Sequence, residues 1–200
     1  MSGKEQKNLA EFINCLSMME SQTSILYKDL SNKVDVSLIK TLLEGISIDS
    51  QKHSILLRGV SENINQPKGD LKGCAKNLAI LQRVVKLQKE ISKMKKITSE
   101  DLFKLNEKLQ LLESQMGEEY YVFVQMKTLT FMVNQIDQSY NVDLSSVKRI
   151  FTGIISDEER HTEVLETIKK MVAPKEDIAN PFVRFQHPDA WYQSPAPDSY

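Results

Sequence analysis

Two histidines lie close to acidic residues at spacings that suit metal binding. Glu158 and His161 are three residues apart, and Asp49 comes four residues before His53. Side chains three or four residues apart lie on one face of a helix, so a carboxylate and an imidazole at this spacing can reach the same metal ion. A single Glu-x-x-His motif is common on charged helices, and His161 taken alone is better explained as a hydrogen-bonded residue at the edge of a core.

The segment around each histidine occurs twice in the chain. An offset of 108 residues aligns positions 34–57 with 142–165 without a gap, and nine of the 24 aligned pairs are identical. Roughly two identities are expected by chance from ordinary composition. The identical pairs include Asp49 with Asp157 and His53 with His161. Repeated helical hairpins pair about a pseudo-two-fold axis, which predicts that the two histidines face each other at one level of a bundle.

The elements that must position these residues are predicted to be helices. Apolar residues recur at spacings of three and four, the period of amphipathic helices, and Pro67 is the one proline before residue 174. We therefore predict an all-α fold: a four-helix bundle made of two repeated hairpins, with an extra helix in the long crossover. Residues 1–173 form this domain, with helices at about 4–30, 36–60, 71–96, 99–137 and 144–171.

Sequence signals also suggest where two of these helices begin. Asp35 is expected to cap the helix at 36–60, and residues 98–101 (TSED) resemble a capping box at the start of the helix at 99–137. Residues 174–200 contain several prolines and aromatic residues and cannot form a regular helix. We expect this tail to be an extended strap that docks on the bundle, on a second subunit or on a partner protein.

Several acidic residues fall on faces that should be buried. Helical phase places Glu20 and Glu158 inside, and in the helix at 99–137 it favours Glu119, with Glu118 about 100° around the helix. A buried carboxylate without a partner costs several kcal/mol, so each of these side chains needs a cation, a proton or a hydrogen-bond donor. One metal site would satisfy all of them.

These motifs resemble those of rubrerythrin and the wider ferritin-like di-iron carboxylate superfamily, of which the chain looks like a divergent member. Glu20-Ser21-Gln22 followed by Tyr27 is similar to the first helix of rubrerythrins, Gly117-Glu118-Glu119 to the start of their third, and Glu158 with His161 to the fourth. The resemblance covers about 120 of the 200 residues. It implies a ferritin-like bundle that binds iron, as a pair of ions or one, or another divalent transition metal.

The resemblance also implies a set of ligands. The expected ligands are Glu20, His53, Glu119, Glu158 and His161. Family position favours Glu118 over Glu119, whereas helical phase favours Glu119, which we prefer. Ser50 stands where the family has a bridging glutamate, so the second Glu-x-x-His motif is incomplete, and Asp49 is the residue that could compensate. Two metals, one or none are all compatible with this set.

Two functions follow from these expectations. The first is an iron-dependent oxidoreductase or iron-handling protein that reacts with dioxygen or peroxide. It would need an external electron donor, because the chain has no CxxC pair for a built-in electron-transfer module. The second is a non-catalytic bundle that lost the full site and serves as a structural or protein-binding module. An unrelated helical adaptor is less favoured, because it leaves the matched histidines unexplained.

Amino-acid composition bears on the cellular compartment of the protein and on its binding partners. A net charge of -1 gives no electrostatic case for nucleic acid or an anionic membrane as a partner. The two cysteines, Cys15 and Cys74, lack CxxC spacing, which argues against a disulfide framework and a thiolate metal site and favours the cytoplasm. The lysine-rich helix at 71–96 has apolar positions that must pack somewhere, and a subunit interface of a homodimer is one such place.

Overall fold

The computed structural model describes residues 3–67, 69–125 and 145–174. All regular secondary structure in these ranges is helical, and the helices are α1 (Gly3–Lys33), α2 (Ser37–Ile64), α3 (Leu71–Asn77), α4 (Ala79–Ser92), α5 (Ser99–Gln125) and α7 (Ser145–Val172). This confirms the predicted all-α bundle. The end of the predicted helix at 99–137 and the tail beyond Pro174 lie outside the described residues.

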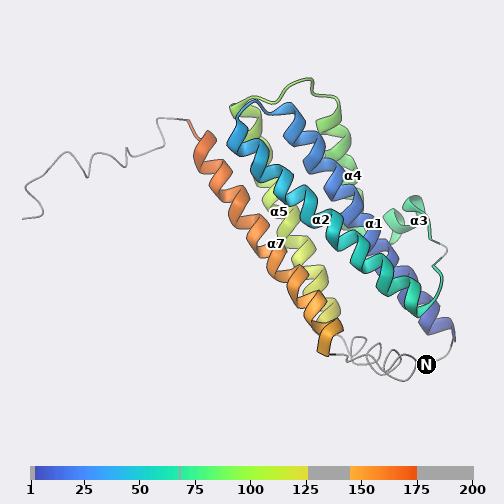
Figure 1. The fold of residues 1–200 in the computed structure, drawn as a ribbon. Helices are drawn as coiled ribbons and strands as arrows, with labels where there is room; N and C mark the ends of the chain where they lie inside the picture. Colours follow the sequence, from blue (N-terminus) through green and yellow to red (C-terminus); the bar gives the residue numbers. More distant parts are fainter. Residues whose placement is uncertain (1–2, 68, 126–144, 175–200) are drawn as a thin grey trace, which may run out of the picture.

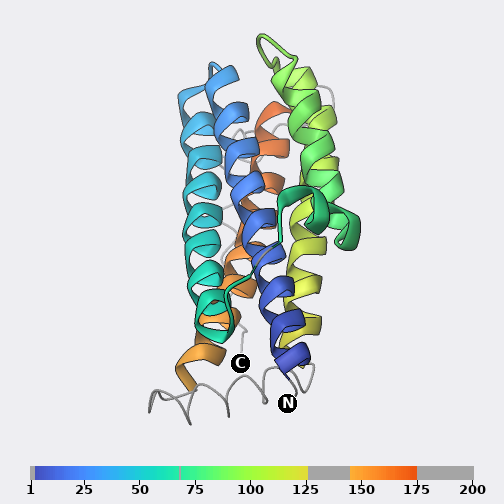
Figure 2. The same ribbon diagram turned by 90° about the vertical axis from the view of Figure 1, so that its right-hand side faces the viewer.

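Four long helices, α1, α2, α5 and α7, run side by side along the molecule (Figure 1). The chain ascends in α1 and returns in α2, and it then crosses back through α3 and α4 to the end at which α5 begins. α5 therefore runs in the same direction as α2, and α7 runs antiparallel to α5. Figure 2 shows α4 as a fifth helix on the flank of the bundle, where it contacts both α1 and α5.

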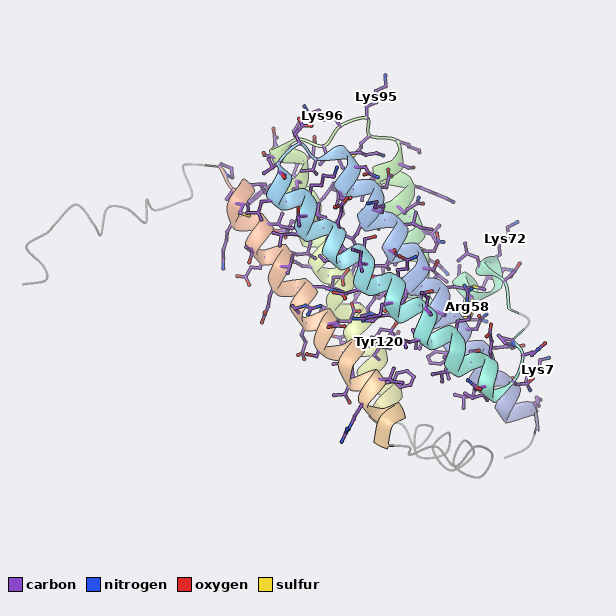
Figure 3. The ribbon with its side chains drawn as sticks, viewed as in Figure 1. Lys7, Arg58, Lys72, Lys95, Lys96 and Tyr120 are labelled. Atoms are coloured by element: carbon purple, nitrogen blue, oxygen red, sulfur yellow. A yellow bond between two sulfur atoms is a disulfide. The ribbon has the colours of Figure 1, made fainter. Side chains whose placement is uncertain are left out.

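The buried faces of α1 and α7 contain Glu20 and Glu158, as helical phase predicts. Both faces are apolar stripes interrupted by polar side chains that are themselves buried. The stripe in α1 includes Leu9, Ile13, Leu16, Glu20, Thr23, Tyr27 and Leu30. The stripe in α7 includes Phe151, Ile154, Glu158, His161, Leu165 and Ile168. Charged side chains such as Lys72 and Lys95 extend outward instead, whereas Tyr120 lies inside the bundle (Figure 3).

The helix bounds of α2 and α7 follow the internal repeat. The offset of 108 residues that aligns the two histidines also pairs the first residues, Ser37 and Ser145, and the last residues, Ile64 and Val172. Asp35 does not cap α2 as predicted. The N-cap is Val36 without a side-chain cap, and Asp35 forms an ion pair with Lys96. The other predicted start is confirmed, because Thr98 and Asp101 exchange reciprocal capping hydrogen bonds.

The crossover is broken into two helices, whereas the sequence pattern predicts one at 71–96. Leu78 adopts an extended conformation that ends α3 and begins α4, and its side chain is buried. The break allows α3 to turn onto α1 while α4 continues along the bundle. The end of α4 is fixed to the end of α1, where Lys33 donates a hydrogen bond to the carbonyl of Ile91.

A disulfide joins Cys15 of α1 to Cys74 of α3, and the prediction that the cysteines stay unpaired is therefore wrong. The two residues are 59 positions apart, a separation that gives no local signal, and only the return of α3 onto α1 brings them together. Both side chains are buried. Among the described residues, no helix combines the length and the apolar character that crossing a membrane requires.

Candidate metal site

Four of the five predicted ligands meet in the centre of the bundle. Glu20 from α1, His53 from α2, and Glu158 and His161 from α7 are each no more than 1% exposed. The rings of His53 and His161 are 6.3 Å apart, centroid to centroid, as expected if the two hairpins place them at one level. These four residues bring two carboxylates and two imidazoles into the centre of the bundle.

The fifth ligand was predicted incorrectly, because α5 presents Glu113 to the centre and not Glu119. Glu113 is fully buried, whereas Glu119 is partly exposed and Glu118 is exposed. Glu119 lies beside Ala79 at the start of α4 and lines a surface cavity there. The physical reason is the fifth helix: α4 covers one flank of α5 and widens its apolar stripe, so the middle of that stripe does not face the bundle centre.

A second repeat in the sequence could have identified Glu113. Glu113-Ser114-Gln115 followed by Tyr120 repeats Glu20-Ser21-Gln22 followed by Tyr27, with an offset of 93 residues. The offset between α2 and α7 is 108, so an ungapped comparison at one offset finds one pair of helices and misses the other. The difference of 15 residues is located in the sequence between Tyr120 and Val142, where one offset gives way to the other.

The two tyrosines of this repeat bind the carboxylate of the opposite hairpin. The hydroxyl of Tyr27 donates to Oε1 of Glu113 at 2.5 Å, and the hydroxyl of Tyr120 donates to Oε1 of Glu20 at 2.5 Å. Both tyrosines are fully buried. Each bond fixes one carboxylate oxygen, and the two bonds are related by exchange of the hairpins. This crossed arrangement holds both carboxylates in place across the bundle.

Each histidine directs one ring nitrogen toward the carboxylates and the other toward an aspartate. Nδ1 of His53 lies 3.5 Å from Oε1 of Glu20, and Nε2 lies 2.9 Å from Asp157. In the same way, Nδ1 of His161 lies 3.0 Å from Glu113, and Nε2 lies 3.5 Å from Asp49. An aspartate on the outer nitrogen favours the tautomer with its proton on Nε2 and leaves Nδ1 for a metal.

Asp49 therefore does not replace the missing glutamate. Its carboxylate is half-buried, lies on the outer side of His161 and also forms an ion pair with Arg160. Ser50 occupies the inward position, is fully buried and has no hydrogen-bond partner for its hydroxyl. The residue aligned with Ser50 by the repeat is Glu158. The centre is thus symmetric in its other side chains and asymmetric at this pair.

Several buried polar atoms in the centre lack a hydrogen-bond partner. They are Oε2 of Glu20, Nδ1 of His53 and both carboxylate oxygens of Glu158. Two groups of possible ligand atoms, each within 4.8 Å of one another, are Glu20 with His53 and Glu158, and Glu113 with Glu158 and His161. Glu158 belongs to both groups. Carboxylate oxygens and imidazole nitrogens in this combination suit iron, manganese or zinc.

Burial and mutual repulsion change how these groups hold protons in the absence of metal. Burial and the nearby charges of Glu20 and Glu113 raise the pKa of Glu158 well above its ordinary range. Burial alone would lower the pKa of His53, but Glu158 and Glu20 outweigh it and raise the pKa to about 10. Burial and the adjacent carboxylates also raise the pKa of both tyrosines. In metal-free protein each shift favours the protonated form of its group.

The outer aspartates remain ionised, because cations surround them. Burial would raise the pKa of Asp157, but the ammonium of Lys52 and the ring of His53 lower it. Lys52 contacts both Asp49 and Asp157, at 3.0 and 2.8 Å, and so links the two outer positions at the bundle surface. Cations at the bundle surface therefore hold the two aspartates that orient the histidines.

No family model, curated protein or solved structure matches this chain, so the geometry of the site is the basis for assigning a function.

Proposed function

We propose that this chain is a rubrerythrin-like metal protein with a ferritin-like fold, which binds iron or a similar divalent transition metal in the bundle core. The observation that carries the proposal is Glu158, which is 1% exposed: neither carboxylate oxygen has a hydrogen-bond partner, although Nδ1 of His53 lies 3.3 Å from Oε1. A buried carboxylate in this state costs several kcal/mol unless a proton or a cation compensates it. A cation shared with Glu20 and His53 would satisfy their unpartnered atoms at the same time.

The two ligand groups support binding of two metal ions that share Glu158. One ion would be held by Glu20, His53 and Glu158, and the other by Glu113, His161 and Glu158. Three protein ligands for each ion leave coordination positions for small molecules, as catalytic metal sites require. Iron in such a site supplies redox chemistry with dioxygen or peroxide when it is bound. The substrate and an external electron donor are parts of the same proposal.

The protein side chains have defined tasks in this function. Tyr27 and Tyr120 orient Glu113 and Glu20, and their hydroxyl protons lie at the edge of the centre. Asp157 and Asp49 orient the histidines and keep Nδ1 directed inward. Surrounding apolar residues, including Met116 and Phe151, are fully buried. An apolar environment of this kind strengthens electrostatic interactions with any charged group that forms there.

Ser50 supports a second candidate, a non-catalytic bundle with a structural or protein-binding role. This residue removes one carboxylate from the centre, and His53 then lies among Glu20, Glu158 and Asp157 as an internal cation. The raised pKa of His53 and of Glu158 allows such a core to persist with protons in place of metal. The cytoplasmic location is also a proposal, and the disulfide between Cys15 and Cys74 is uncommon in that compartment.

Metal content of the purified protein decides between the two candidates. We would produce the untagged protein in iron-supplemented medium and measure metals per chain, in parallel with a variant carrying Glu158→Ala and His161→Ala. The expected result is about two iron atoms per chain in the natural protein, as two ligand groups imply, and loss of both in the variant.

The matched control for this experiment is Glu163→Ala, which changes an exposed carboxylate on the same helix. It should keep the metal content of the natural protein. Circular dichroism of each variant checks that the bundle has formed, and Glu158→Gln replaces the double variant if that protein does not fold. Absence of transition metal from the natural protein would reject the iron function and favour the non-catalytic bundle.

A further inference from the structure

The two ligand groups differ in their access to the surface. A cleft of about 410 Å³ between α5 and α7 is lined on its inner side by Glu113 and Glu158. Its outer part is lined by Gly117, Glu118, Glu159 and other residues of these two helices. Glu118 and Glu159 are exposed, so the cleft leads from two surface carboxylates to two buried ones. The ligand shared by both metal groups therefore forms part of the wall of a surface opening.

Gly117 keeps this opening free. A Cβ atom at this position would lie 3.5 Å from Cβ of Glu158, which is ordinary van der Waals contact. A longer side chain would extend beyond that contact and cover the inner end of the cleft. Glycine weakens a helix interior by about 1 kcal/mol relative to alanine. Its presence in the middle of α5 is consistent with a requirement for space at this point.

The corresponding side of the first hairpin is closed. The repeat offsets align Gly117 with Ser24, and Ile155 with Ser47. Ser47 donates a hydrogen bond to the carbonyl of Ser24 at 2.8 Å, and this contact ties α1 to α2. A groove does run along this face, but its walls include neither Glu20 nor Ser50. The two hairpins thus offer one opening to the centre and one closed surface in the described part of the chain.

The open face of the α5–α7 hairpin and the closed face of the α1–α2 hairpin also differ in charge. Glu118 and Glu159 align with Ile25 and Gln51, so the open face has two carboxylates where the closed face has uncharged side chains. The groove on the closed face contains Lys28 and Arg58 together with Asp29 and Glu44, so charges of both signs are present there. Clefts lined by charge of one sign raise the local concentration of the opposite ion and its rate of association. The open face attracts cations toward the site.

We infer that the cleft between α5 and α7 is the route by which a divalent cation reaches the buried centre, with Glu118 and Glu159 as its outer binding groups. The inner end of the route is Glu158, which is 1% exposed and has two unpartnered oxygens. A cation that passes the outer pair is transferred to this carboxylate, which belongs to both ligand groups. This inference rests on the proposed metal function and adds the direction from which the metal arrives.

The rate of metal uptake tests the route. Co²⁺ is the probe, because it develops visible absorbance in nitrogen and oxygen sites, and stopped-flow mixing with metal-free protein follows its arrival. Replacement of the outer pair, Glu118→Gln with Glu159→Gln, should slow uptake at low salt by about 3- to 10-fold. The difference should diminish at high salt, because exposed charges are screened. Final Co²⁺ stoichiometry should match that of the natural protein, because the inner ligands are intact.

A second variant tests the opening itself. Gly117→Leu should slow uptake at every salt concentration, because a bulky side chain covers the inner end of the cleft. The matched controls are Glu62→Gln with Glu100→Gln, which removes two exposed charges away from the cleft, and Gly153→Leu, which adds the same side chain to α7 where a Cβ meets open space. Both controls should take up Co²⁺ at the natural rate.

The possible outcomes separate this inference from the proposed function. Normal Co²⁺ stoichiometry with unchanged rates in both cleft variants would overturn the route and leave the metal function in place. Slower uptake in the control variants, to the same extent as in the cleft variants, would also overturn it. Absence of Co²⁺ from the natural protein would overturn the route together with the metal function.

Discussion

The hairpin α1–α2 and the hairpin α5–α7 supply matching sets of side chains to one centre. Each gives a glutamate, a tyrosine, a histidine and an aspartate, and each tyrosine or aspartate acts on the opposite hairpin. Among the charged side chains of the centre, the hairpins differ at one position, where Ser50 of α2 corresponds to Glu158 of α7. They also differ at the surface, since the cleft lies beside Gly117 and the serine contacts close the other face. The second hairpin thus supplies three of the five side chains in the candidate ligand groups, and the cleft lies on its side of the bundle.

The replacement Ser50→Glu would restore the missing carboxylate and so removes the main difference between the hairpins. In metal-free protein it should lower the free energy of unfolding by several kcal/mol, because another carboxylate is buried beside Glu20 and Glu158. Added Fe²⁺ should recover this loss, since the new side chain is placed to bind the same ions. Chemical denaturation with chelator and with metal measures both effects.

The control for this prediction is Ser50→Gln, which has similar size without the charge. It should destabilise the protein through its volume and gain no more from metal than the natural protein does. If Ser50→Glu were equally stable with chelator and with Fe²⁺, the inward position of residue 50 would not belong to a metal centre. In that case α2 of the first hairpin would contribute less to metal binding than α7 of the second.

Covalent attachment is a second difference, because the disulfide fixes α1 of the first hairpin to the crossover. The closed loop spans 59 residues, and the entropy that such a crosslink removes from the unfolded chain predicts a contribution of about 2–4 kcal/mol. Reductant should therefore lower the free energy of unfolding by this amount. The metal content should remain unchanged, since Cys15 and Cys74 are not among the ligand groups.

Denaturant titration with and without reductant measures this contribution. The variant with Cys15→Ser and Cys74→Ser is the control, because reductant should have no effect on its stability. A thiol assay on unfolded protein that has not been reduced should detect no free thiol. Two free thiols per chain, together with unchanged stability in reductant, would contradict the bond.

The sequence was sufficient for features that depend on periodicity within one helix. The buried stripes of α1 and α7, including Glu20 and His161, follow from helical phase alone. In α5, helical phase gave the wrong inward residue. The packing of α4 on one flank of α5 widens its apolar stripe, so the middle of the stripe is not at Glu113. Helical phase also gave no information on Cys15 and Cys74, whose proximity depends on the break at Leu78. Features set by a third packed element are therefore the ones that a single-helix pattern misses.

The crossed tyrosine bonds allow the finest comparison of the two hairpins. Tyr27→Phe and Tyr120→Phe each remove one hydrogen bond to a carboxylate, which is worth about 1.5–3 kcal/mol. The losses should differ in metal-free protein. Glu113 keeps its contact with Nδ1 of His161 at 3.0 Å, whereas Oε2 of Glu20 already has no hydrogen-bond partner. Tyr120→Phe should therefore destabilise the protein more than Tyr27→Phe does.

Unfolding of the two single variants and of the double variant, all with chelator, tests this order. The loss in the double variant should depart from the sum of the two single losses, because the two glutamates that the tyrosines bind both interact with Glu158. Addition of metal should reduce the difference between the single variants, since a metal ion gives Oε2 of Glu20 a partner. A larger loss of stability in Tyr27→Phe than in Tyr120→Phe would contradict this order. It would mean that Glu113 depends on its tyrosine more than Glu20 does.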